Sequence, residues 1–170
     1  MGNSAAPVIS QISTPVAASS EAPDLSLRGV AFARLSDGRL VARGTAEHLD
    51  YRRAGGRLIA TDSETTLMPE PGTGLASFET LHVSAPHVEG EIANRRGAGS
   101  GGVNLDTGRG DHAFSEAATY DGATVRSDSR VIGRGPGYRV EGNGMVAAAD
   151  GSSVHLTRGV KGTLDLETRR

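Results

Sequence analysis

Short runs of β-forming residues, cut at fairly even spacing by glycine-containing turns, constrain this chain more than any other feature. Three Asp-Gly pairs and two further glycine-rich sites punctuate the runs: Asp37-Gly38, Asp121-Gly122, Asp150-Gly151, Ala54-Gly55-Gly56 and Gly142-Asn143-Gly144. Asp-Gly tolerates the positive φ that both central positions of a type I′ hairpin turn require. No helical period extends beyond a few residues, so the pattern predicts an all-β meander, sandwich or roll.

The expected strands lie between these turns. They are placed at about Leu25–Leu35, Arg39–Arg52, Arg57–Met68, Leu75–Ala85, His87–Ala93, Val103–Leu105, Ala113–Tyr120, Thr124–Ile132, Tyr138–Gly142, Met145–Ala149, Ser153–Thr157 and Val160–Leu166. The loop Arg95–Gly102 is Gly-rich and is expected to be long. Residues 1–24 are rich in Ala, Ser and Pro and predict a disordered tail or linker. One domain is expected over residues 25–166, with a frayed C-terminus at 167–170.

Strict alternation in several segments gives the predicted sheet one apolar and one charged face. The apolar face is light, because Val, Ala, Gly and Ser stand where a closed sandwich would carry Leu, Ile and Phe. Two interpretations remain open. The sheet is either half of a thin but ordinary sandwich, or an open, curved sheet whose inner face leaves room for a long apolar guest.

Composition excludes several classes of function. The net charge is −2, with acidic and basic residues interspersed, whereas nucleic-acid binding needs a concentrated basic surface. The absence of cysteine rules out disulfides, thiolate metal sites and cysteine nucleophiles. No apolar run is long enough to span a membrane, and no signal peptide is recognisable. Aromatic residues make up only 4% of the chain, which disfavours a carbohydrate-active enzyme, because sugar subsites use aromatic stacking.

The remaining motifs do not predict catalysis or a cofactor. The segment 97–102 matches G-x-G-x-x-G, but no helix follows to meet a pyrophosphate. Of the five histidines, His82, His87 and His112 could converge with Asp111, yet solvated strand histidines are the simpler interpretation, and no metal site is predicted. The tripeptide Arg109-Gly110-Asp111 is interpreted as a turn. The protein is therefore predicted to be neither an enzyme nor a cofactor carrier.

Several stretches, in order, resemble the periplasmic lipopolysaccharide-export family of LptC, LptA and OstA-like domains. The segment Gly38–Tyr51 (GRLVARGTAEHLDY) is similar to the N-terminal hairpin of LptC, and Arg57–Met68 fits its second strand. Further resemblance lies in Ala118–Gly122 with Val125, in Ser129–Gly133, in Gly137–Met145 (GYRVEGNGM) and in the closing segment Val154–Leu166. The order of the motifs carries the resemblance, since each motif is loose alone.

The resemblance implies an open, twisted antiparallel β-jellyroll, or β-taco, in the periplasm at the inner membrane. Its trough would take the acyl chains of lipopolysaccharide. One edge strand would pair with the periplasmic part of an LptF/LptG-type transporter, and the other with an LptA-like bridge protein. A head-to-tail homo-oligomer is also compatible. Family members usually carry an N-terminal membrane helix, and no such segment is recognisable here.

Under this hypothesis the trough residues are apolar contacts rather than reacting groups. They are Leu40, Ala42, Val88, Ile92, Val125, Val131, Tyr138, Val140, Val154 and Leu156. Phe32, Val160 and Leu164 are the candidates for edge-strand docking. The alternative hypothesis is a structural or adhesive β-sandwich domain of a bacterial surface protein, in which the small side chains simply form a thin core.

Overall fold

The computed structural model describes residues 22–68, 80–91, 93–94, 96–148 and 153–164. These residues form an all-β fold of ten strands and one 3-10 turn. The elements are β1 (Leu25–Ser36), β2 (Arg39–Arg52), η1 (Ala54–Gly56), β3 (Arg57–Leu67), β4 (Leu81–Glu91), β5 (Arg96–Thr107), β6 (His112–Tyr120), β7 (Thr124–Gly135), β8 (Tyr138–Ala148), β9 (Val154–Leu156) and β10 (Lys161–Leu164). The predicted fold class is confirmed.

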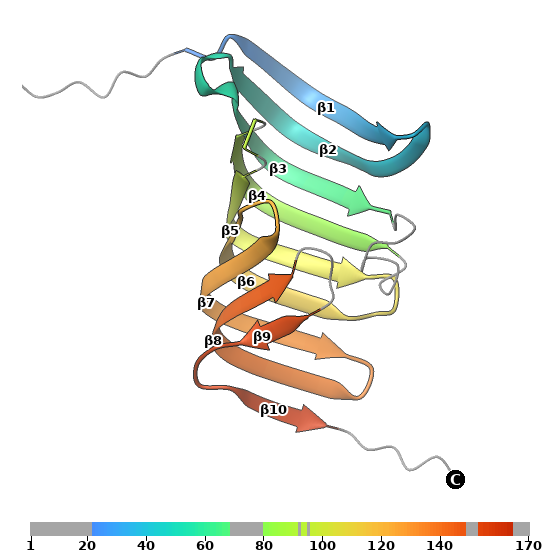
Figure 1. Ribbon diagram of the computed structural model, residues 1–170, viewed down its shortest axis with the longest axis vertical. Helices are drawn as coiled ribbons and strands as arrows, with labels where there is room; N and C mark the ends of the chain where they lie inside the picture. The colour runs from blue at the N-terminus through green and yellow to red at the C-terminus, as the bar shows by residue number, and fades with distance from the viewer. Residues whose placement is uncertain (1–21, 69–79, 92, 95, 149–152, 165–170) are drawn as a thin grey trace, which may run out of the picture.

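All ten strands belong to one antiparallel sheet (Figure 1). The first eight strands follow one another in chain order, as expected of a meander. Strands β9 and β10 then pair, one after the other, with the same free edge of β8. The sheet is therefore open, with β1 at one end and β9 and β10 at the other. This is the open β-jellyroll, or β-taco, expected from the sequence.

Two of the predicted turns use positive φ as expected. Asp37 and Gly38 have φ of 50° and 75°, which joins β1 to β2 through the predicted Asp-Gly turn. Gly55 and Gly56 have φ of 79° and 61° between β2 and β3. Asp121 behaves differently, because its Oδ1 accepts hydrogen bonds from the N–H groups of Ala123 (3.1 Å) and Thr124 (2.8 Å). This turn is therefore closed by the aspartate side chain.

Three predicted interruptions are wrong, because the strands run through them. Pro86 separates two expected strands but lies inside β4, at a register shift. The expected Gly-rich loop forms most of β5, where Gly101 and Gly102 have φ of 82° and 108°. The expected turn at Gly142–Gly144 lies inside β8. Proline and glycine in a strand mark a bulge as often as an end. Asp150-Gly151 lies outside the described residues.

These irregularities line up across the sheet and form a single crease. In β1 to β3 the crease passes through Gly29 (φ 58°), then Glu47, then Asp62 (φ 47°). The register places Asp62 opposite Pro86 in β4, since Ser63 pairs with Ala85 and Thr61 with His87. At this line each of the strands β1 to β4 exchanges the faces on which its odd and even residues lie.

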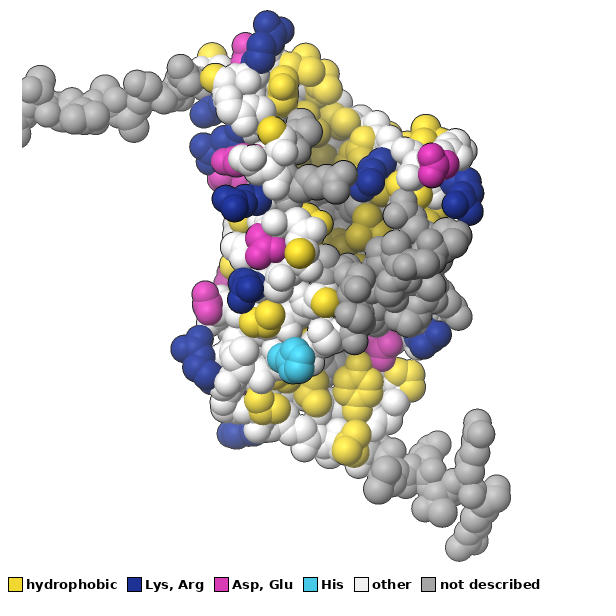
Figure 2. All heavy atoms as spheres, viewed as in Figure 1, with side chains coloured by type: hydrophobic (Ala, Val, Ile, Leu, Met, Phe, Trp, Pro, Cys, Tyr) yellow, Lys and Arg dark blue, Asp and Glu magenta, His cyan; other side chains and the backbone are white. Residues whose placement is uncertain are grey.

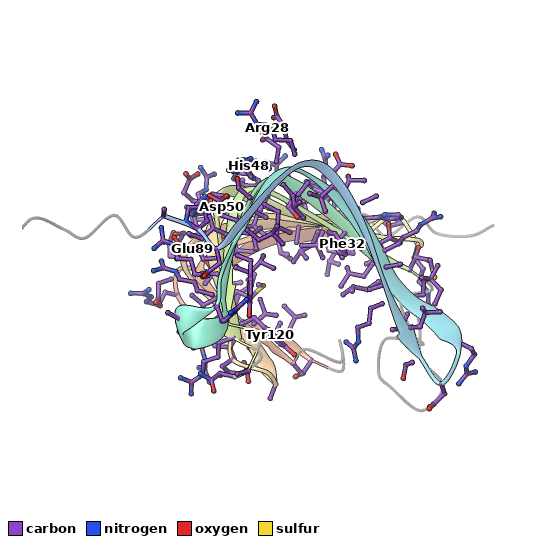
Figure 3. The ribbon with its side chains drawn as sticks, turned by 90° about the horizontal axis from the view of Figure 1, so that it is seen from above. Arg28, Phe32, His48, Asp50, Glu89 and Tyr120 are labelled. Carbon is purple, nitrogen blue, oxygen red and sulfur yellow. The ribbon has the colours of Figure 1, made fainter. Side chains whose placement is uncertain are left out.

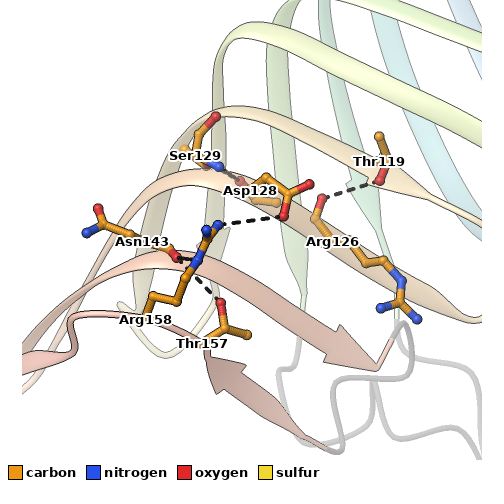
Figure 4. Close-up of polar contacts among 9 residues, drawn as sticks. Thr119, Arg126, Asp128, Ser129, Asn143, Thr157 and Arg158 are labelled. Carbon is orange, nitrogen blue, oxygen red and sulfur yellow. Dashed lines mark hydrogen bonds and ion pairs between the residues drawn. The ribbon is translucent and has the colours of Figure 1, made fainter.

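The crease continues through the second half of the sheet as a series of bulges. Register shifts occur at Ser84/His87, Ser100/Val103, Ser115/Thr119 and Ser127/Arg130. It ends where the chain passes from β9 to β10. There the Asn143 N–H donates to the Arg158 carbonyl (2.7 Å). Arg158 Nε donates to the Asn143 carbonyl (3.0 Å), as Figure 4 shows. A bulge bends its strand. One bulge or kink per strand therefore folds the whole sheet along one line.

The core follows the crease rather than filling a space between two sheets. The buried residues are small or slender: Ala42, Ala46, Ala60, Ala85, Val103, Val131, Met145, Ser115 and Ser127. All but Ala42 lie beside the crease. Among the described residues no large side chain is fully buried. Small side chains are needed here, because the two halves of the sheet converge at the bend.

The two buried serines stabilise the bulges of β6 and β7. Their Oγ atoms lie 2.7 Å apart. Ser115 Oγ also lies within hydrogen-bond distance of the Ala117 (3.2 Å) and Arg130 (3.3 Å) carbonyls, and Ser127 Oγ accepts from the Ser129 N–H (3.1 Å). A bulge leaves backbone groups outside the ladder. The serine hydroxyls supply the partners that those groups lack.

We expect Ser127→Ala to lower the free energy of unfolding by about 1–3 kcal/mol, because it leaves a buried backbone N–H without its acceptor. The measurement is urea denaturation followed by circular dichroism. Ser153→Ala, at an exposed serine, is the matched control and should change little. Equal stability of the two variants would show that the bulge does not depend on the Ser127 hydroxyl.

Candidate apolar trough

Folding along the crease turns the sheet into an open trough. Viewed from above, the ribbon is an arch, with Phe32 and Tyr120 on its inner side and Arg28, His48 and Asp50 on its outer side (Figure 3). The trough runs across the strands from β1 to β10, about 40 Å at the usual strand spacing. Each strand packs mainly against its neighbours in the sheet, so the two walls do not close on one another.

Cross-strand pairing shows which side chains share the inner face. On one wall, Leu49, Ala60, Val88, Gly99 and Ala118 form one continuous row from β2 to β6. On the other wall, Val83, Leu105, Ala113, Gly133 and Val140 form a second row from β4 to β8. Both rows are apolar and contain glycine. The inner face is thus continuous and lined by small side chains, and no second sheet of described residues packs against it.

The predicted trough residues share this inner face but do not form one compact cluster. Ala42 and Val131 are buried, at 8% and 2% exposure, whereas Val88, Val125, Tyr138, Val140 and Leu156 are half-buried. Leu40 and Val154 are exposed, towards opposite ends of the trough. Ile92 lies outside the described residues. The register brings the rest to both walls and to the crease, and their contact with lipid stays a prediction.

Sequence alternation missed several of the larger inner-face side chains. They are Leu49, Leu58, Leu67, Leu81, Val83 and Leu105. In β2, β3 and β4 the face exchange at Glu47, Asp62 and Pro86 explains the omission, because a single alternation cannot describe a strand on both sides of the crease. Aspartate is one of the few non-glycine residues enriched at positive φ. The residue type at Asp62 is therefore the one sequence feature that could have indicated the kink in β3.

The three predicted docking residues lie at opposite ends of the sheet. Phe32 belongs to the end strand β1, and its ring covers Gly44 of β2. Val160 precedes β10 and Leu164 ends it, at 55% and 72% exposure. Leu25, Leu27 and Leu35 add further exposed apolar side chains to β1. Figure 2 shows hydrophobic side chains near both ends of the molecule.

The outer face is polar and carries paired charges. Arg57 and His87 both contact Glu89, and the His87 hydrogen bond is the main cause that holds the pKa of Glu89 below its usual value. The Arg130 hydrogen bond similarly lowers the pKa of Glu141. These pairs are exposed, and such pairs contribute little to stability. They distinguish the solvent side of the sheet from the trough.

A hollow of about 530 Å³ lies on the polar side of β1 to β5. Its lining includes Arg43, Glu64, Thr66, His82 and Asp106. A twisted sheet curves like a saddle. Along each strand the outer face is convex, but from one strand to the next it is concave, and the hollow lies in this concave direction. Its mixed charges do not suit hydrocarbon. The sequence predicts no metal site at His82, His87, Asp111 and His112, and among the described residues no group of three His, Cys, Asp or Glu side chains could hold a metal ion.

Tyr138 lies at the rim of the trough, at the start of β8, and contacts the residue that precedes β6. Its hydroxyl donates to Asp111 Oδ1 (3.0 Å), and burial followed by this hydrogen bond raises its pKa. Thr107 Oγ1 donates to Asp111 Oδ2 (3.1 Å). Both oxygens of Asp111 are therefore engaged, so the Arg109-Gly110-Asp111 turn does not present a free carboxylate.

No protein-family model and no curated protein matches the sequence. Within the described residues, no helix has the length and apolar character needed to cross a membrane. What the chain is shown to be, accordingly, is an open single-sheet β-taco with an apolar inner face.

Proposed function

We propose that this protein is a non-enzymatic carrier that binds the acyl chains of lipopolysaccharide in its trough. The observation that supports it most is the continuous, unfilled apolar inner face, which no second sheet covers in the described part of the chain. Small side chains along the crease keep the floor of the trough low. Larger apolar residues, such as Leu49, Val83 and Val140, offer hydrocarbon contact on the walls.

The energetics favour a long-chain guest. Each methylene group removed from water contributes about 0.8 kcal/mol, so ten buried methylenes supply roughly 8 kcal/mol before the costs of association. The same burial removes water from inner-face residues that are half-exposed in the free protein. Micromolar binding corresponds to about 8 kcal/mol net, so the costs of association require more than ten buried methylenes, from a longer chain or from a second chain in the trough.

The open ends of the trough support a role in passing lipid onward. The exposed apolar side chains of β1 at one end and of Val154, Val160 and Leu164 at the other lie where a similar domain would extend the inner face. Strand addition at such an edge uses unpaired backbone groups. The partners we propose are an LptF/LptG-type inner-membrane transporter, an LptA-like bridge protein and a second copy of this chain, in the periplasm.

The alternative, a structural or adhesive sandwich domain, lacks an observation in its favour. A sandwich needs two packed sheets, whereas the described strands form one. The adhesion-like tripeptide has its aspartate engaged by Tyr138 and Thr107.

The test is uptake of a fluorescent fatty acid by the purified protein, followed by its displacement with lipopolysaccharide. We expect saturable binding at micromolar concentrations, with a blue shift of the probe, and competitive displacement. A protein that remains folded but takes up no probe would contradict the proposal and favour the structural alternative.

A further inference from the structure

Two arginines face each other at the rim of the trough, and no carboxylate among the described residues forms an ion pair with either of them. Arg134 of β7 and Arg139 of β8 are direct cross-strand neighbours, and His112 of β6 is the next residue in the same row. The β-carbons of such neighbours lie about 5 Å apart. Both arginines are exposed on the outer face. Like charges directly opposite one another disfavour the sheet, so this pair calls for a counter-ion.

The acidic groups nearest in the register already have partners. Asp111 bonds Tyr138 and Thr107, Asp106 Oδ1 lies 2.6 Å from His112 Nδ1, and Glu141 Oε1 accepts from Arg130 Nε (2.8 Å). Within the described part of the chain, no carboxylate forms an ion pair with Arg134 or Arg139. Arg139 does interact electrostatically with Glu141, but the Glu141 hydrogen bond goes to Arg130, so among the described residues neither guanidinium group of the pair is held by a carboxylate.

Their position relates them to the trough. Tyr138 and Val140 flank Arg139 in sequence and lie on the inner face, while Arg139 lies on the outer face of the same strand. The turn between Gly135 and Tyr138 is the rim at this point, with Gly137 at φ 79°. An amphiphile with its chain against Val140 would hold its headgroup beside this rim, within reach of two long, flexible side chains.

We propose that Arg134 and Arg139 form an anion site for the phosphate monoester headgroup of an amphiphile held in the trough. The inference rests on the proposed function and adds the chemical class of headgroup. Two guanidinium groups offer paired N–H donors whose geometry matches phosphate oxygens, and charge-assisted hydrogen bonds of this kind are the stronger ones. Phosphate binding would also relieve the repulsion between the two arginines.

The test compares lysophosphatidic acid with the monoacylglycerol of the same acyl chain, each displacing a fluorescent fatty acid below its critical micelle concentration. We expect the wild-type protein to bind the phosphorylated lipid about ten- to a hundredfold more tightly, the range for charged hydrogen bonds. Arg134→Gln/Arg139→Gln should abolish this preference and leave monoacylglycerol affinity unchanged. Added NaCl should weaken the preference in the wild type.

Arg126→Gln is the matched control. Arg126 lies on β7, as Arg134 does, but towards the opposite rim, and its Nε lies 3.8 Å from Oδ2 of Asp121. The preference for the phosphorylated lipid should therefore survive its replacement. If the double variant still prefers the phosphorylated lipid, the inference is wrong, but the proposal that the trough binds acyl chains is not affected. Equal affinity for glycerol 3-phosphate and lysophosphatidic acid would mean that the site binds free phosphate and not an amphiphile. If neither lipid displaces the probe from the wild type, the proposed function and the inference both fail.

Discussion

Val140→Asp should abolish uptake of a fluorescent fatty acid while the protein stays folded. Val140 lies on the inner face, half-buried, with a methyl group 3.0 Å from where a β-carbon on Gly133 would lie. A carboxylate here would meet the acyl chain, and burying it against hydrocarbon costs several kcal/mol. We expect binding to weaken by at least two orders of magnitude. The measurement is a probe titration, with circular dichroism confirming the fold.

His155→Asp is the control for this prediction. His155 pairs with Val146 across β8 and β9 and is exposed on the outer face, so the same carboxylate is placed on a neighbouring strand, away from the trough and from Arg134 and Arg139. Its uptake should match the wild type. Val154→Asp, near the β9 end, should reduce uptake as well, because Val154 pairs with Ala147 on the inner face. Unchanged uptake in folded Val140→Asp would mean that lipid does not occupy this wall.

Gly44→Ala should produce the largest loss of stability for the smallest change in side chain. A β-carbon at Gly44 would overlap the backbone carbonyl of Glu64 and the ring of Phe32. The carbonyl belongs to the β2–β3 ladder and cannot move without disturbing the register. Overpacking of this kind costs about 3 kcal/mol. We expect a matching decrease in the free energy of unfolding by urea, with β1 losing its protection in hydrogen exchange first.

Gly90→Ala is the same substitution where space exists. Its β-carbon would lie 3.4 Å from the carbonyl oxygen of Arg96, an ordinary contact, and Gly90 lies on the same inner face. A compatible Gly→Ala change stabilises by about 0.4–1 kcal/mol, because it reduces the freedom of the unfolded chain. The two variants should therefore shift stability in opposite directions. Equal shifts would show that Phe32 does not pack on Gly44 as the structure has it.

Much of the architecture could be predicted from local patterns. The turn at Asp37-Gly38 was predictable because few residue pairs accept two positive φ values. The alternation in Val125–Val131 and in Val154–Leu156 placed apolar side chains on one face, and the register agrees. The scarcity of large apolar residues left a thin sandwich and an open sheet equally possible, and the described strands form the open sheet.

The crease could not be predicted, and with it the true extent of several strands. Pro86, the glycines of 97–102 and Gly142–Gly144 are local signals for chain breaks, and each proved to be a bulge or a bend inside a strand. Whether a proline or glycine ends a strand or bends it depends on the neighbouring strand, which a local window does not contain. The same limitation concealed the face exchange that brings Leu67 and Leu81 inward.

The sequence by itself determined that this chain is a β-meander with one light, apolar face, because side-chain alternation and turn chemistry are local properties of the backbone. Only the tertiary structure decided that the meander bends along one line, which side chains meet inside the bend, and that Arg134 stands opposite Arg139. Those features arise from register between strands. Register is set by hydrogen bonding and packing between residues distant along the chain.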